Sequence, residues 1–92
     1  MYELNRKDSH PLNYVVTPGD YLREWLEDRG ITGPGFAFMT GIDAGAINGI
    51  LNGSRTIDPL MADRLGSSTG IPAKAWTKLQ NHYDSERRRL QL

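Results

Sequence analysis

The sequence predicts a single all-α domain of five short helices, preceded by a short N-terminal arm. Three observations support this prediction. Apolar residues recur at intervals of three and four after residue 16, residues typical of helix starts and stops separate these stretches, and no stretch has the alternation expected of a strand. A chain of 92 residues has room for one hydrophobic core.

The first sixteen residues differ from the rest of the chain. Residues 1–16 mix polar and aromatic side chains without a sustained period, so we interpret them as an arm, either disordered or extended against a partner. A helix is then expected to start at Thr17, with Pro18 in its first turn and Asp20 close behind. Gly30 suits its left-handed C-cap.

A short second helix is expected over residues 34–39. Its opening "GPG" is a poor helix sequence, because proline is tolerated only in the first turn and glycine lowers helix propensity. Thr40 and Gly41 then predict a turn, and Asp43 is a suitable cap for the helix that follows.

The third helix is expected to run to about Leu51 and to end at Asn52 or Gly53. Gly45 and Gly49 lie inside it, and each costs about 1 kcal/mol relative to alanine. Such a helix is stable only if its apolar side chains pack on its neighbours. We therefore interpret its glycines as small residues on its outer face.

Two more helices follow. Asp58 and Pro59 repeat the cap-then-proline start, and this fourth helix is expected to pass through Leu65 and end within residues 66–70. Pro72 opens the fifth. One face of the fifth helix carries Ala75, Trp76, Leu79, His82 and Tyr83.

The apolar positions of the first four helices and their connections predict the core. The residues assigned to it are Leu22, Leu26, Phe36, Ala37, Ile42, Ile47, Ile50, Ile57, Met61, Ala62 and Leu65. The fifth helix has few neighbours left to cover its apolar face. We therefore expect a homodimer whose interface contains Trp76, Leu79, His82 and Tyr83.

Composition excludes several classes of protein. The chain has no cysteine, so neither a disulfide framework nor a thiolate metal site is available. No apolar run approaches the ~20 residues of a membrane span, and the N-terminus lacks the features of a signal peptide. These observations predict a cytoplasmic protein that is not associated with a membrane.

Charge gives a weaker indication. Eleven basic and eleven acidic residues balance, which argues against strong non-specific binding of nucleic acid. Residues 31–92, however, carry seven basic and five acidic side chains, so this part of the chain is net positive by two.

Three stretches, "TPGDYLREWLEDRGIT", "GIDAGAINGILNGSRTIDPLMADRL" and "AWTKLQNHYD", resemble the HigA-type antitoxins. These are small proteins of the Xre/Cro-repressor helix-turn-helix superfamily, and the resemblance covers about residues 17–84. It implies a lambda-repressor-like helix-turn-helix domain over residues 17–92 that pairs through its last helix. It also implies binding to double-stranded operator DNA of its own operon, and neutralisation of a RelE-like ribonuclease toxin.

The resemblance also implies which residues contact DNA. They are Thr32, Asp43, Ala44, Gly45, Ala46, Asn48, Asn52, Ser54 and Arg55. Residues 44–46 and Asn48 would face the major groove, while Asn52, Ser54 and Arg55 would lie near phosphate. Two features depart from the family: Gly33 stands where glutamine is usual, and the side chains of residues 44–46 offer no donor or acceptor to a base edge.

An alternative hypothesis is a protein-interaction module that keeps this scaffold without binding DNA, either a toxin-sequestering antitoxin or a phage-encoded regulator. Neutral net charge and the small residues at 44–46 favour it, whereas Arg55 and the arginines at 87–89 oppose it. An enzyme lacks support, because Asp8, Ser9 and His10 lie on an arm that cannot hold a nucleophile and base in fixed geometry. The two histidines also lack neighbouring metal ligands, so we expect no cofactor or metal.

Overall fold

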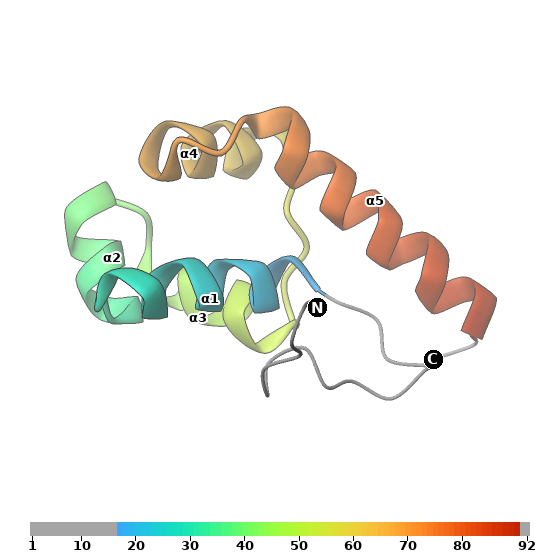
Figure 1. Cartoon of the computed structure of the whole chain (residues 1–92), viewed down its shortest axis with the longest axis horizontal. Helices are drawn as coiled ribbons and strands as arrows, with labels where there is room; N and C mark the ends of the chain where they lie inside the picture. Colours follow the sequence, from blue (N-terminus) through green and yellow to red (C-terminus); the bar gives the residue numbers. More distant parts are fainter. Residues whose placement is uncertain (1–16, 91–92) are drawn as a thin grey trace, which may run out of the picture.

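The structure, a computed structural model, describes residues 17–90 as five helices joined by short connections (Figure 1). They are α1 (Pro18–Arg29), α2 (Gly33–Thr40), α3 (Ala44–Asn52), α4 (Pro59–Thr69) and α5 (Ala73–Leu90). Residues 17–90 contain no strand, so the predicted all-α class and the five helices are confirmed. The predicted arm, residues 1–16, lies outside the described residues. None of the five helices is both long and apolar enough to cross a membrane.

The first four helices begin at a side chain that caps the helix. The hydroxyl oxygens of Thr17 and Thr32 each accept a hydrogen bond of 3.0 Å from the backbone N–H three residues later. The carboxylates of Asp43 and Asp58 do the same at 3.0 and 2.8 Å. Each such cap typically stabilises a helix by about 1 kcal/mol. The caps expected at Thr17, Asp43 and Asp58 are confirmed.

Glycines in the left-handed conformation end α2 and α3. Gly41 has φ of 77° and Gly53 has φ of 83°, and residues other than glycine adopt such backbone angles only at a cost in free energy. Gly41 therefore makes the turn between α2 and α3, as predicted. Helix α4 extends to Thr69, at the far end of the predicted range, where the Thr69 hydroxyl donates to the carbonyl oxygen of Leu65 at 2.7 Å.

All eleven residues predicted for the core are buried. Two further side chains join them, Ala46 with 6% of its surface exposed and Trp76 with none. The Trp76 ring packs edge-on against Tyr21, with ring centroids 5.6 Å apart. Trp76 therefore has no surface to offer a second copy, and its expected place at a dimer interface is corrected: Tyr21 of α1 and the other residues of the core cluster already cover it within one chain.

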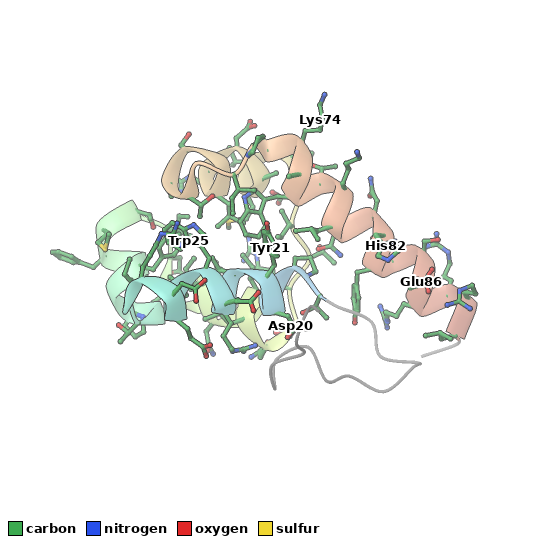
Figure 2. The ribbon with its side chains drawn as sticks, viewed as in Figure 1. Asp20, Tyr21, Trp25, Lys74, His82 and Glu86 are labelled. Atoms are coloured by element: carbon green, nitrogen blue, oxygen red, sulfur yellow. The ribbon has the colours of Figure 1, made fainter. Side chains whose placement is uncertain are left out.

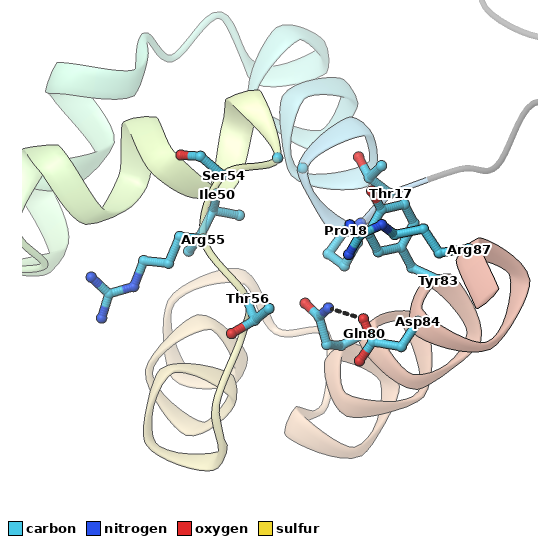
Figure 3. A pocket seen from close by; sticks show the side chains of 12 residues that line it. Thr17, Pro18, Ile50, Ser54, Arg55, Thr56, Gln80, Tyr83, Asp84 and Arg87 are labelled. Carbon is cyan, nitrogen blue, oxygen red and sulfur yellow. Dashed lines mark hydrogen bonds between the residues drawn. The ribbon is translucent and has the colours of Figure 1, made fainter. Parts of the chain in front are cut away.

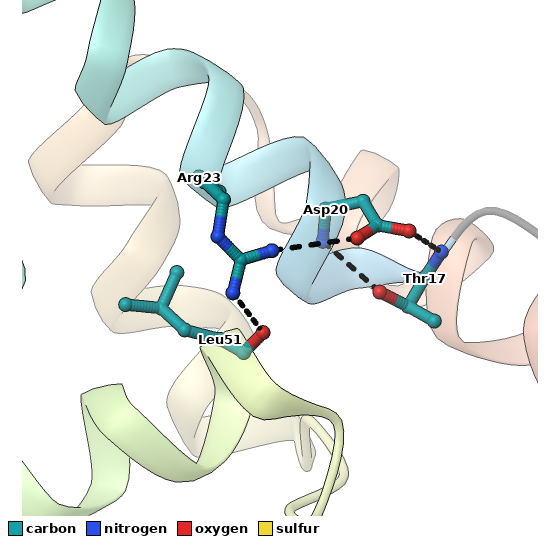
Figure 4. Close-up of polar contacts among 4 residues, drawn as sticks. All are labelled: Thr17, Asp20, Arg23 and Leu51. Atoms are coloured by element: carbon teal, nitrogen blue, oxygen red, sulfur yellow. Dashed lines mark hydrogen bonds and ion pairs between the residues drawn. The ribbon is translucent and has the colours of Figure 1, made fainter. Parts of the chain in front are cut away.

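The start of α1 lies directly on the end of α3 (Figure 4). A Cβ atom at Gly19 would overlap the carbonyl oxygen of Ile50 and lie 3.0 Å from its carbonyl carbon. The Arg23 guanidinium donates a hydrogen bond of 2.6 Å to the carbonyl oxygen of Leu51 and also lies 3.5 Å from the Asp20 carboxylate. The "PGD" sequence therefore helps to cap α1 through Asp20 and lets α1 approach the C-terminus of α3 through Gly19.

Candidate nucleic-acid interface

Helices α2 and α3 form the helix-turn-helix pair. The N-terminus of α2 packs beside the second half of α3, because a Cβ atom at Gly33 would lie 3.3 Å from Leu51 Cδ1 and 3.9 Å from Ile47 Cγ2. Thr32, exposed at the N-cap of α2, consequently lies on the side of the domain where α3 ends. The predicted pairing of these two helices is therefore present.

The outer face of α3 is narrow and bears few polar groups. Ala44, Asn48 and Asn52 are exposed and follow one another at intervals of four, which places them in one line along the helix. Gly45 is exposed beside this line. Of these residues, only the two asparagines carry donors and acceptors that could meet a base edge.

Two small residues of α3 do not lie where the sequence predicted. Ala46 is buried in the core, so its expected place on the groove-facing surface is corrected. It lies one and four residues before Ile47 and Ile50, on the same side of α3 as these core residues. Gly49 is also buried rather than on the outer face. A Cβ atom there would lie 3.0 Å from the Cβ of Arg55, so glycine at this position lets the following loop close against α3.

The connection after α3 is held in a fixed course. The backbone N–H groups of Ser54 and Arg55 donate to the carbonyl oxygen of Gly49 at 2.9 and 3.1 Å. The Asn52 side chain accepts a hydrogen bond of 3.0 Å from the Ser54 N–H. Arg55 is exposed, and within residues 17–90 its guanidinium has no hydrogen-bond or ion-pair partner. It is therefore available to an anion outside the chain.

Arg64 is a cation near this surface that the sequence analysis did not single out. It lines a small cavity of about 180 Å³ together with Asp43 and Ala46 of α3 and with Arg55. The spacing of the buried residues of α4 places Arg64 on the outside of that helix. Its proximity to the start of α3 could not be predicted, because it depends on how α4 packs across the domain.

The charge of the surface is mixed. Arg55 and Arg64 would attract phosphate, whereas Asp43 and Asp58, which line the same cavity, would repel it. In the described part of the chain no three histidine, cysteine or acidic side chains gather as they would around a metal ion. Arg55 and Arg64 are therefore the side chains of this cavity that could attract an anion, and the two carboxylates oppose them.

The residues expected at a dimer interface are divided by the structure. Leu79 and His82 line an open, largely apolar depression of about 350 Å³ between α1 and α5, together with Tyr21, Ala75 and Lys78. Figure 2 shows Tyr21 and His82 on these two helices. Tyr83 instead lines a separate cleft near Thr17 and Pro18. Tyr21, 40% exposed, was not among the residues expected at the interface, because only the packing of α1 against α5 brings it beside Leu79.

The arginines at the end of α5 are partly engaged. The Arg87 guanidinium lies 6.0 Å from the centre of the Tyr83 ring, and Arg89 forms an ion pair with Glu86. The hydrogen bond from Arg89 lowers the pKa of the Glu86 carboxyl group, as expected for a pair that favours the charged form. These contacts are typical of a solvated helix end.

Solved structures of other proteins are similar to this chain. One is a Pseudomonas aeruginosa protein in complex with its 18-bp operator DNA, with 29% identity and a TM-score of 0.80 over 86% of each chain. Another is the Pseudomonas aeruginosa antitoxin HigA with the higBA promoter, with 29% identity and a TM-score of 0.79 over 85% of this chain and 86% of that one.

A third is a Nostoc punctiforme protein described as an antidote protein of a plasmid maintenance system. It is 31% identical, with a TM-score of 0.77 over 84% of each chain. These neighbours are operator-binding and antitoxin proteins rather than enzymes. No family model matches the sequence, and a comparison with curated proteins finds no match.

Proposed function

The chain belongs to the HigA-type antitoxins, a family of helix-turn-helix proteins, and on that premise we propose that it binds operator DNA and represses its own operon. The observation that carries the proposal is the similarity of this chain, over about 85% of its length, to two proteins whose structures contain operator or promoter DNA. The exposed line of α3 would enter the major groove.

The contacts available to this chain predict modest binding. Asn48 is the side chain best placed to meet a base edge, since Ala44 and Gly45 present no donor or acceptor. Arg55 and Asn52 would contact phosphate, along with Thr32 at the start of α2 and Ser54 in the connection. Part of the sequence preference would then come from the shape of the DNA.

Two substitutions test this assignment. Arg55→Ala should weaken binding to all sequences alike and flatten the salt dependence by about one unit of log–log slope for each protomer on the DNA, because one phosphate contact is lost. Asn48→Ala should relax discrimination at one base pair by roughly 1–3 kcal/mol. The measurement is a titration with the protein's own promoter DNA and with scrambled DNA at several salt concentrations.

Lys74→Ala is the control, because it removes the same charge from an exposed position at the start of α5, on the side away from α3 (Figure 2). Its slope should match that of the unaltered protein. Nanomolar, sequence-dependent binding that survives Asn48→Ala and Arg55→Ala together would show that another surface contacts the bases.

We further propose that the depression between α1 and α5 is the centre of a homodimer interface. A lysine at position 79 can lay its apolar stem along the core while its ammonium reaches the surface, so Leu79→Lys should leave the fold intact. It should weaken the dimer by roughly tenfold or more, because two like charges would meet near the two-fold axis. Sedimentation equilibrium measures this change.

Thr77→Lys is the matched control, since it adds the same charge two residues away, at an exposed position on another side of α5. It should leave the dimer constant unchanged. If the unaltered protein sediments as a monomer at ~100 μM, the interface proposal is wrong, because that concentration populates even weak dimers.

Neutralisation of a RelE-like ribonuclease toxin is the remaining part of the proposal, and it rests on family membership alone. Co-expression with the neighbouring reading frame tests it: a toxic product whose growth inhibition this chain relieves, and which purifies with it, would support the proposal. The alternative is an interaction module on the same scaffold. The absence of binding to any DNA in the titration would favour that alternative.

A further inference from the structure

Gln80 is a buried polar residue in the middle of α5. Only 7% of its surface is exposed. Its side-chain oxygen Oε1 accepts a hydrogen bond of 2.9 Å from the backbone N–H of Ile57. Its Nε2 donates one of 3.0 Å to Oδ1 of Asp84, one turn further along the helix (Figure 3). Both functions of the amide are therefore used within the chain.

Asp84 orients this amide. A carboxylate only accepts hydrogen bonds, so it requires the NH2 group of Gln80 to face it. The carbonyl oxygen of the same amide then faces the Ile57 N–H. The two contacts together make a directional link from α5 to the backbone of the connection between α3 and α4.

The connection is thus fixed at both ends. At its start, the N–H groups of Ser54 and Arg55 are bonded to the carbonyl oxygen of Gly49 in α3. At its end, Ile57 is bonded to Gln80. Arg55 belongs to the first anchor and precedes the second by two residues, and its side chain extends away from α5 (Figure 3). Both anchors therefore hold the stretch of backbone from which the guanidinium projects.

We propose that Gln80 is a positioning residue for DNA binding, which holds the exposed connection so that Arg55 meets a phosphate. The inference rests on the proposed function, in which Arg55 makes that contact. Leu79 and His82 of the depression between α1 and α5 lie on the same helix as Gln80. The hydrogen bond from Ile57 to Gln80 therefore also sets the distance between Arg55 and that depression.

A reversal of donor and acceptor distinguishes positioning from packing. Gln80→Glu keeps an acceptor for the Ile57 N–H but places a second carboxylate against Asp84, and the like charges repel. Adding Asp84→Asn restores a donor opposite the new carboxylate. This exchanged pair has the same net charge and nearly the same shape as the original pair, with the hydrogen bond running in the opposite direction.

The experiment measures the effect of Arg55→Ala on the dissociation constant for promoter DNA in three backgrounds: the unaltered protein, Gln80→Glu, and Gln80→Glu with Asp84→Asn. Arg55→Ala should weaken binding by the same factor in the first and third backgrounds. In the Gln80→Glu background, Arg55→Ala should change the logarithm of the dissociation constant by less than half as much. Amide exchange at Ile57 should be faster in Gln80→Glu and return to its original rate in the exchanged pair.

An equal Arg55→Ala factor in all three backgrounds would overturn the inference while leaving the proposed function intact. If Arg55→Ala has no effect in the unaltered protein, the phosphate contact itself is wrong, and the inference fails with it. Thermal melting checks that each variant is folded. If Gln80→Glu does not fold, Asp84→Ala replaces it in the cycle, because it removes only the group that orients the amide.

Discussion

Trp76→Ala is expected to lower the free energy of unfolding by about 3–5 kcal/mol, the range for removing a large aromatic side chain from a core. Trp76 has no exposed surface and packs on Tyr21 within the single hydrophobic cluster. Small domains have free energies of unfolding of about 5–15 kcal/mol, so this substitution would remove a large part of the total. Urea denaturation followed by circular dichroism measures the change.

Trp25→Ala is the matched control, because it removes the same side chain from a partly buried position. Trp25 packs on Phe36 with ring centroids 5.7 Å apart, and the Arg29 guanidinium lies 4.1 Å from its ring centre. We expect roughly half of the loss or less, since less apolar surface leaves water there. A Trp76→Ala protein that keeps its stability and becomes monomeric would instead return Trp76 to a dimer interface.

Gly19→Ala is expected to destabilise the domain by about 2–3 kcal/mol, at the upper part of the range for overpacking. The new methyl group would overlap the carbonyl oxygen of Ile50, and backbone atoms cannot move aside as a flexible side chain can. α1 would have to lift from the end of α3 and weaken the Arg23 contact to Leu51. In a domain of this size the melting temperature should fall by roughly 10 °C or more.

Gly45→Ala tests whether this loss comes from the crossing or from helix propensity. Gly45 is the second residue of α3, as Gly19 is the second residue of α1. A Cβ atom there would meet only the end of the Asp43 side chain, at 2.9 Å. The change in stability should stay within about 1 kcal/mol, the difference in propensity between glycine and alanine. Equal losses at the two glycines would contradict the role assigned to the crossing.

Many features of the fold could be predicted from local patterns because their causes are local. Thr17, Asp43 and Asp58 cap helices through hydrogen bonds to N–H groups three residues away, so the sequence around them is sufficient. The core positions of the first four helices follow from the helical repeat. Family membership, too, was implied by short motifs and is confirmed by comparison.

The candidate site was predicted less completely, since its residues depend on which faces meet. Helical spacing allowed Ala46 and Gly49 on the outside of α3, but both are buried. Ala46 lies near Met61 of α4, and the loop at Arg55 closes over Gly49. Arg64 joins the surface only because α4 lies beside the start of α3.

The fifth helix shows the same division. Its apolar face was evident from the spacing of Trp76, Leu79 and Tyr83, but spacing cannot tell an intramolecular neighbour from a second subunit. In the folded chain Trp76 is core, Leu79 borders an open depression, and Tyr83 faces a different cleft. Gln80 was not singled out at all, because its partner Ile57 lies 23 residues away and only the packing of α5 brings the two together.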